Sequence, residues 1–265
     1  MTLDVQHTTC IGIDIASSRR PFSYAALDSS RRLLALGQCQ ILEILAFTSG
    51  QEQAVIALNA PLQTSQGLMQ QEDIRRQLTP HPAPGRWTEM RVAEYQLHAA
   101  GIHVPHTPSR SKDCPVWMQN GFTLAQNLRS YHYQPYPAED APRQLLETQT
   151  DALFQILSGQ TPADVKTLEG RLQRQVLLFD QRLPVTDPME LFEEVTRYRL
   201  LRGELSINNV LSSGELNALS AAHAAWLAAH HPEQLQTFGM PQEGLIFLPV
   251  VSPQPSVHGR ANSLD

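Results

Sequence analysis

An apolar segment near the N-terminus contains a single charged residue, and this combination restricts the fold more than any other feature. The segment is Cys10-Ile-Gly-Ile-Asp-Ile-Ala16, which predicts a buried strand with Asp14 within it. A carboxylate is costly to bury unless it is paired or binds a cation. Asp14 is therefore a candidate functional residue. The alternative is that Asp14 ends the strand and caps the next turn through Ser17 or Ser18.

Further short apolar segments predict a sheet that mixes antiparallel and parallel strands. Residues 22–27 and 33–39 are predicted strands joined by the turn at Asp28-Ser-Ser30, which makes an antiparallel meander with the first strand. Later strands are predicted at 54–58, 144–148 and 245–251, and residues 131–142 are predicted to form a loop. Helices are predicted at 41–47, 67–78, 86–100, 116–128, 151–157, 167–179, 189–201 and 216–230. The chain begins with strands and continues with strands that alternate with helices. This order indicates an α/β fold in which helices cover a sheet.

The length of 265 residues suits one or two domains. We expect a single domain over residues 1–251, with helical insertions at about 67–142 and 160–210. Residues 252–265 are polar and are expected to form a flexible tail.

The charge and cysteine content limit the function classes. The net charge is −6, and Lys112 and Lys166 are the only lysines among the 20 basic residues. An acidic chain without a long basic stripe disfavours tight, extended binding of nucleic acid. The three cysteines show no CxxC spacing, which favours a reducing compartment. No apolar run approaches the length of a membrane span, and the N-terminus lacks a signal-peptide pattern, so we expect a cytoplasmic protein without a membrane partner.

Several short motifs follow one another across most of the chain. They are Gly12-Ile-Asp14, Ala57-Leu-Asn-Ala-Pro-Leu62, Arg86-Trp-Thr-Glu89 with Gly101-Ile-His-Val-Pro105, Trp117-Met with Gly121-Phe, Glu147-Thr148, Lys166 with Gly170-Arg171, Asn217-Ala218, and Glu243-Gly-Leu-Ile246 with Pro249. In this order and spacing, the chain resembles the domain-of-unknown-function 429 family, whose members are predicted to be ribonuclease H-like nucleases. The resemblance implies a ribonuclease H-like fold with a site of converging carboxylates.

The resemblance also implies the site residues. The catalytic positions are Asp14, Glu147, Asn59 and Asn217, and the metal ligands are Asp14 and Glu147, holding Mg²⁺ or Mn²⁺. Asn59 and Asn217 stand where the family typically has aspartate. Two-metal cleavage of a phosphodiester needs several carboxylates around the cations, so the two amides favour a site with one ion or none.

Two functions of different classes follow. The first is a divalent-metal-dependent nuclease or phosphodiesterase, weakened by the two changes to asparagine. The second is a catalytically inactive member that binds a nucleotide, nucleic acid or protein partner through the same cleft. A kinase-like enzyme is disfavoured, because Ile15-Ala-Ser-Ser-Arg19 supplies no glycine for a phosphate loop. The substrate and the oligomeric state stay open.

Other polar residues have a weaker functional pattern. Arg86 with Glu89, and Arg91 with Tyr95, are spaced for a surface helix with intrahelical contacts. Lys166 and Arg171 could contact phosphate, and a solvated helix face explains them equally well. Glu243 fits a turn better than a catalytic acid. The histidines lack the HExxH spacing of a zinc site and are expected to be surface or packing residues.

Overall fold

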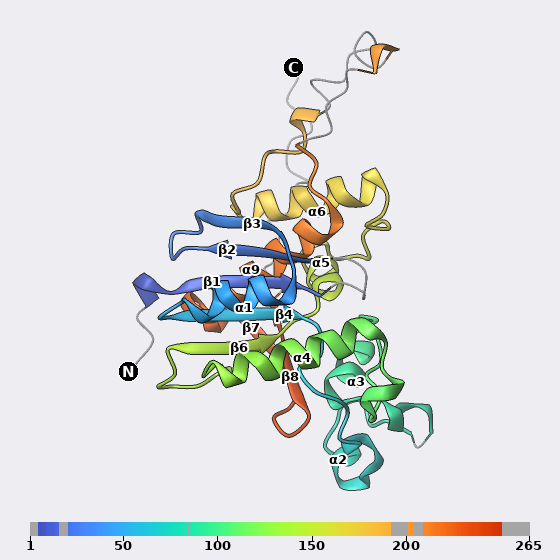
Figure 1. Ribbon diagram of the computed structural model, residues 1–265. Coiled ribbons are helices and arrows are strands. Elements are labelled where there is room, and N and C mark those ends of the chain that lie inside the picture. The colour runs from blue at the N-terminus through green and yellow to red at the C-terminus, as the bar shows by residue number, and fades with distance from the viewer. Residues whose placement is uncertain (1–4, 16–20, 84, 192–200, 204–208, 251–265) are drawn as a thin grey trace.

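The structure is a computed structural model that describes residues 5–15, 21–83, 85–191, 201–203 and 209–250. Within these residues, eight strands form one mixed sheet flanked by helices (Figure 1). The order across the sheet is β3-β2-β1-β4-β6-β8-β7, and β5 pairs with β6 outside this path. The strands are β1 (Thr9–Asp14), β2 (Phe22–Leu27), β3 (Leu33–Cys39), β4 (Ala54–Asn59), β5 (Gln134–Pro135), β6 (Arg143–Glu147), β7 (Leu235–Met240) and β8 (Gly244–Pro249).

The strand directions confirm the predicted mixture. β1, β2 and β3 form the antiparallel meander, whereas β1 pairs parallel with β4, β4 with β6, and β6 with β8. The sequence did not predict β7, which pairs antiparallel with β8 at the end of the sheet. Every residue of β7 is at least partly exposed, so it lacks the apolar run that marks the central strands. The predicted loop at 131–142 contains the two-residue strand β5, which corrects that prediction.

The helices follow the predicted positions, with two exceptions. They are α1 (Ile41–Ser49), α2 (Glu72–Arg76), α3 (Val92–Ala99), α4 (Val116–Ser130), α5 (Thr150–Ser158), α6 (Leu168–Asp180) and α9 (Ser213–His230). The predicted helix at 67–78 is instead a 3₁₀ turn at Leu68–Gln70 followed by the short helix α2, because Gln71 between them is extended. The predicted helix at 86–100 is wrong in its first half. Arg86–Glu89 is a 3₁₀ turn, Met90 is extended, and α3 begins only after Arg91. The predicted helix at 189–201 and the predicted tail at 252–265 fall largely or wholly outside the described residues.

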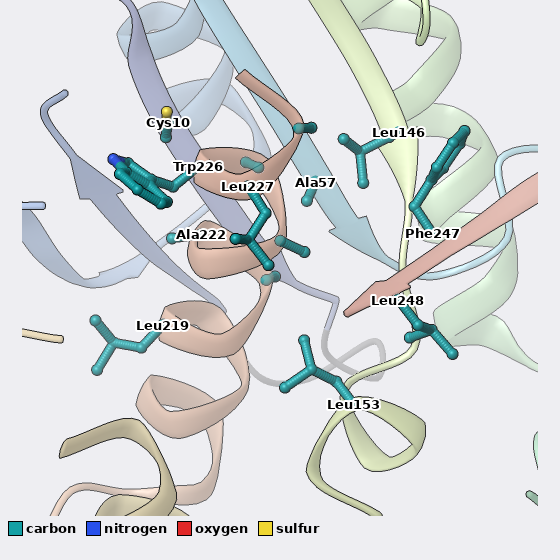
Figure 2. Close-up of a cluster of buried hydrophobic side chains, with 14 of the residues drawn as sticks. Cys10, Ala57, Leu146, Leu153, Leu219, Ala222, Trp226, Leu227, Phe247 and Leu248 are labelled. Atoms are coloured by element: carbon teal, nitrogen blue, oxygen red, sulfur yellow. The ribbon is translucent and has the colours of Figure 1, made fainter. Parts of the chain in front are cut away.

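The long helix α9 lies against the centre of the sheet. The capping box predicted for its start is present, with Ser212 as N-cap and Glu215 as its partner. Most of α9 is buried, and its alanines let the helix approach the strands closely. Figure 2 shows α9 side chains Leu219, Ala222 and Leu227 in one cluster with side chains from β1, β4 and β6.

Gly12 on β1 sets how closely α9 approaches. A Cβ atom at Gly12 would lie 2.1 Å from the backbone oxygen of Ala218 and 2.1 Å from the backbone nitrogen of Ala222. Real Cβ atoms do not come so near to backbone atoms, so any larger residue would force the helix and the strand apart. Because Asp14 follows Gly12 by two residues, the close contact of α9 at Gly12 also determines how near the helix lies to the Asp14 carboxylate.

The two faces of the sheet have separate cores. On the face of α9 lie Cys10, Ala57 and Leu146, together with residues of α5 and α6. On the opposite face lie Ile13, Leu58 and Leu145 with residues of α1 and α4. Since side chains alternate along each strand, the registers of β1, β4 and β6 fix which face each polar residue occupies.

The proposed domain limits stay predictions. Within the described residues, the segment 67–142 contains α2, α3, α4 and β5, and the segment 160–210 contains α6. None of the helices in the described part of the chain is both long enough and apolar enough to cross a membrane.

Substitution of Gly12 by alanine is expected to destabilise the protein strongly. The added methyl group would meet α9 backbone atoms at 2.1 Å, and overpacking of this kind costs about 1–3 kcal/mol or more. The measurement is the free energy of unfolding from urea denaturation. Gly37→Ala is the matched control, because a Cβ atom there would lie 3.7 Å from the Tyr24 ring, an ordinary contact. Equal stability of the two variants would contradict the packing role of Gly12.

Candidate functional site

Three of the four predicted site residues meet at one end of the sheet. Asp14 ends β1, Asn59 ends β4 beside it, and the register pairs these two residues directly. Asn59 Nδ2 donates to Asp14 Oδ1 at 2.6 Å, and Asn217 Nδ2 on α9 donates to the same oxygen at 3.3 Å. The sheet register and the helix packing thus bring together residues separated by up to 203 positions in the sequence.

The orientation of the Asn59 amide is fixed by the backbone. The Thr150 N–H, at the start of α5, donates to Asn59 Oδ1 at 3.0 Å. A backbone N–H can only donate, so the Asn59 oxygen faces Thr150 and its nitrogen faces Asp14. Asn59 therefore stabilises the Asp14 carboxylate as a donor and has its oxygen already bonded.

Asn217 differs from Asn59 because its amide oxygen has no hydrogen-bond partner in the described segments of the chain. Asn217 Oδ1 is buried and accepts no hydrogen bond among the described residues. The nearby Asp14 Oδ2 likewise has no hydrogen bond within the described part of the chain, since both amides donate to Oδ1. These two oxygens are the acceptors at the site that remain available to a ligand. The predicted alternative, capping by Ser17 or Ser18, falls on residues outside those described.

Burial raises the pKa of Asp14 to about 6. The hydrogen bonds from Asn59 and Asn217 act in the opposite direction, and the negative charge of Asp151 raises the pKa further. Asp14 is thus ionised at neutral pH but binds a proton more readily than an exposed aspartate does. A cation at this position would compete with that proton.

Glu147, the fourth predicted residue, is not brought to the same site. The register pairs Glu147 with Leu58, one position before Asn59, so its side chain belongs to the opposite face of the sheet. Its carboxylate is fully buried and binds the Arg91 guanidinium at two points, 2.5 Å from Nη2 and 3.0 Å from Nη1. The Leu62 N–H also donates to it at 3.1 Å. The structure therefore does not support the predicted pairing of Asp14 and Glu147 around one ion.

Arg91 is the centre of a buried ionic cluster that the sequence did not predict. Its Nε donates to Glu94 at 2.8 Å, and its side chain is 1% exposed, so the predicted surface helix is wrong at this residue. Burial opposes its charge, but the contacts with Glu147 and Glu94 raise the pKa of Arg91 above its ordinary value. Tyr95 is not its partner, because the Tyr95 hydroxyl donates to the Pro80 oxygen.

Glu243 belongs to the same region as a structural acceptor. Its carboxylate is fully buried and accepts bonds from the Val92 N–H at 2.9 Å, the Gln66 N–H at 2.8 Å and the Ser65 hydroxyl at 2.9 Å. The predicted turn is present, since the Glu243 N–H donates to the Met240 oxygen, but its side chain also ties three segments together. The local sequence around Glu243 gives no signal of this burial.

The remaining candidates do not converge on the site. Glu89 and Lys166 are exposed, and the side chain of Arg86 lies outside what the structure describes. The histidines are spread over the fold, and buried His223 lies within α9. No group of three or more histidine, cysteine or acidic side chains suited to a metal ion occurs in the described ranges. Comparisons with protein families, curated proteins and solved structures find no match for the chain.

Replacement of Arg91, the positively charged residue at the centre of the buried ionic cluster, is expected to destabilise the fold. Arg91→Met would leave Glu94 and Glu147 buried without their counterion, which costs about 3–5 kcal/mol. Arg76→Met is the matched control, because Arg76 pairs with Glu72 on the surface, where an ion pair contributes less than about 1 kcal/mol. Both free energies of unfolding are measured at pH 7. Similar losses in the two variants would show that the cluster is not the stabilising element inferred here.

The raised pKa of Asp14 predicts a specific pH dependence of stability. The folded-state pKa of about 6 exceeds the ordinary value of 3.8, so wild-type stability from this group is present below pH 3.8 and is lost as the pH rises through 6. The amide introduced by Asp14→Asn cannot titrate. As the pH rises from 4 to 8, wild type should therefore lose stability relative to Asp14→Asn. The change in the difference between their free energies of unfolding should be on the order of 1–2 kcal/mol, after allowance for partial exposure.

The measurement for Asp14→Asn is urea denaturation of both proteins across this pH range in a chelating buffer. Asp113→Asn serves as the control. Asp113 is exposed, so this substitution removes the same negative charge from the surface. The change with pH should be confined to Asp14→Asn. A pH-independent difference between Asp14→Asn and wild type would contradict the assignment.

Proposed function

We propose that this protein is a ribonuclease H-like phosphodiesterase of the domain-of-unknown-function 429 kind, with its metal site reduced to a single divalent cation. The observation that carries the proposal is the meeting of Asp14, Asn59 and Asn217 at the end of β1. Two central parallel strands and one covering helix supply these residues, which is the arrangement that the family resemblance implies. The ligand class is a phosphodiester in a nucleic acid or nucleotide.

The donor set fits one hard cation. Asp14 Oδ2 and Asn217 Oδ1 are oxygen acceptors without a protein partner among the described residues. Mg²⁺ and Mn²⁺ prefer oxygen ligands and keep water where the protein supplies few. When bound, such a cation would supply an activated water and charge stabilisation at phosphorus. Asn59 would hold the Asp14 carboxylate in place through its 2.6 Å bond.

The same donor set does not fit two cations. Within the part of the chain that the structure describes, Asp14 is the sole carboxylate bonded to the two amides, and Glu147 lies on the other face and binds Arg91. Asp151 influences Asp14 electrostatically but is exposed and pairs with Arg174 at 3.3 Å. Two divalent cations together carry four positive charges, and one carboxylate with neutral amides balances only one of them. We therefore propose slow, one-ion hydrolysis.

The activity test is hydrolysis of single-stranded and duplex DNA and RNA with Mn²⁺, comparing wild type with Asp14→Ala. Wild type should cleave slowly and Asp14→Ala should not. Asn217→Asp should raise the rate by roughly 10–100-fold, because it adds charge at an oxygen that is free to bind the cation. Asn59→Asp should raise it less, because its oxygen is held by Thr150.

The control for contaminating nuclease is the Asp14→Ala protein prepared in the same way. Equal rates for wild type and Asp14→Ala, at every metal concentration, would end the proposal of catalysis. A larger gain from Asn59→Asp than from Asn217→Asp would overturn the proposed roles of the two amides.

A second candidate function is binding without cleavage. It is favoured by the way both amides donate to Asp14 Oδ1, which stabilises the negative charge of the carboxylate without any cation. In that case wild type would bind nucleotide or nucleic acid and show no metal-dependent rate.

We further propose a reducing compartment such as the cytosol, because Cys10, Cys39 and Cys114 are all buried free thiols.

A further inference from the structure

A small pocket borders the candidate site. It has a volume of about 190 Å³, and Ile15 and Asn59 form one side of it. Ile15 follows Asp14 in the chain, and Asn59 donates to Asp14, so the pocket opens next to the carboxylate. Typical small-molecule sites measure roughly 300–1,000 Å³, and this pocket therefore suits one ring system rather than a whole nucleotide.

Gln149 supplies a hydrogen-bonding group to the pocket. It sits between β6 and α5, and its side chain is 7% exposed and lines the pocket. Its amide makes no hydrogen bond to the described residues, yet its polar atoms are not sealed from solvent. A nearly buried amide without a protein partner loses free energy unless water or a ligand satisfies it. A primary amide offers a donor and an acceptor side by side, which matches the edge of a nucleobase.

Trp117 supplies a flat surface. It lies at the start of α4, is partly exposed, and lines the same pocket. No aromatic ring of the described residues stacks on it, unlike Trp87 and Trp226, which contact other rings. Val104 and Pro105 add apolar wall. Trp117 also packs against the core on the face of α1 and α4, so the part of the indole that lines the pocket is the part open to a ligand. An indole is the usual platform on which an unpaired base stacks.

Asp151 gives the pocket a preference among bases. Its carboxylate lines the pocket and is 77% exposed, with one contact to Arg174 at 3.3 Å. A carboxylate accepts hydrogen bonds from exocyclic amino groups but repels carbonyl oxygens. Adenine and cytosine carry such an amino group, and uracil does not.

We propose that this pocket binds one unpaired nucleobase that carries an exocyclic amino group, stacked on Trp117 and hydrogen-bonded to Gln149. The sugar and phosphate stay outside the pocket, next to Asn59. A base within a duplex cannot enter, because both its edge and its faces are occupied, so the ligand is a single strand or a mononucleotide. The link to a phosphodiester at Asp14 rests on the proposed function, whereas the base pocket itself does not.

The test is binding of adenosine by calorimetry in a chelating buffer, so that neither phosphate nor metal takes part. Adenosine should bind to wild type, and uridine should bind more weakly. Gln149→Leu and Trp117→Leu should each weaken adenosine binding by roughly tenfold or more, while Trp117→Tyr retains an aromatic face and most of the affinity. Gln155→Leu is the matched control on the same helix, because Gln155 donates to the Gly101 oxygen and does not line the pocket.

Each outcome separates this inference from the proposed function. Absence of adenosine binding to folded wild type, or equal binding to Gln149→Leu, would overturn the pocket assignment even if the protein cleaves nucleic acid. Adenosine binding that requires Gln149 would support it even if no cleavage is found. A single-stranded oligoadenylate should compete with adenosine and a duplex should not, and competition by the duplex would contradict the requirement for an unpaired base.

Discussion

The contact between α9 and β1 is the interaction on which the rest of the structure depends. Gly12 lets the helix backbone come within a distance that excludes any side chain at that position. The alanines of α9 continue this close approach along the strand, and the largest core cluster forms around it (Figure 2). Because the helix and the strand are fixed relative to each other, Asn217 and Asp14 meet without needing a loop to place them. The geometry of the candidate site follows from packing.

The strand register determines which polar residues share that site. Parallel pairing of β1 with β4 places Asp14 directly beside Asn59. Pairing of β4 with β6 places Glu147 beside Leu58, hence on the other face. A difference of one position therefore separates a site residue from a member of the buried ionic cluster. This face assignment follows from the alternation of side chains along a strand.

Much of the central sheet could be predicted from local sequence, whereas the partners of its charges could not. The apolar runs at β1, β2 and β4 and the capping box before α9 identify their elements directly. Grouping Asp14 with Asn59 and Asn217 needed the family resemblance, since 45 and 203 positions separate them. Glu147 is not in contact with these residues, because the strand register and the bond to Arg91 hold it on the other face of the sheet.

The break before α3 and the burial of Arg91 also could not be predicted from local sequence. Helical spacing over 86–100 gives no sign that Arg91 will be buried, because a long cationic side chain is ordinarily at the surface. Its burial depends on two carboxylates, one three positions away in the chain and the other 56 positions away. The exposed strand β7 was missed for a related reason, because its pairing with β8 rather than its own composition stabilises it.

The two amides at the site change its charge, which has consequences for folding. Aspartates at positions 14, 59 and 217 would crowd negative charge that only cations could balance. With asparagine at two of these positions, the remaining carboxylate receives two N–H donors, which stabilise its negative charge. The cost is a weaker attraction for any cation. The amides are not equivalent, since Thr150 holds the Asn59 oxygen while the Asn217 oxygen is unpartnered among the described residues. The amide oxygen beside Asp14 that has no hydrogen-bond partner among the described residues therefore belongs to α9.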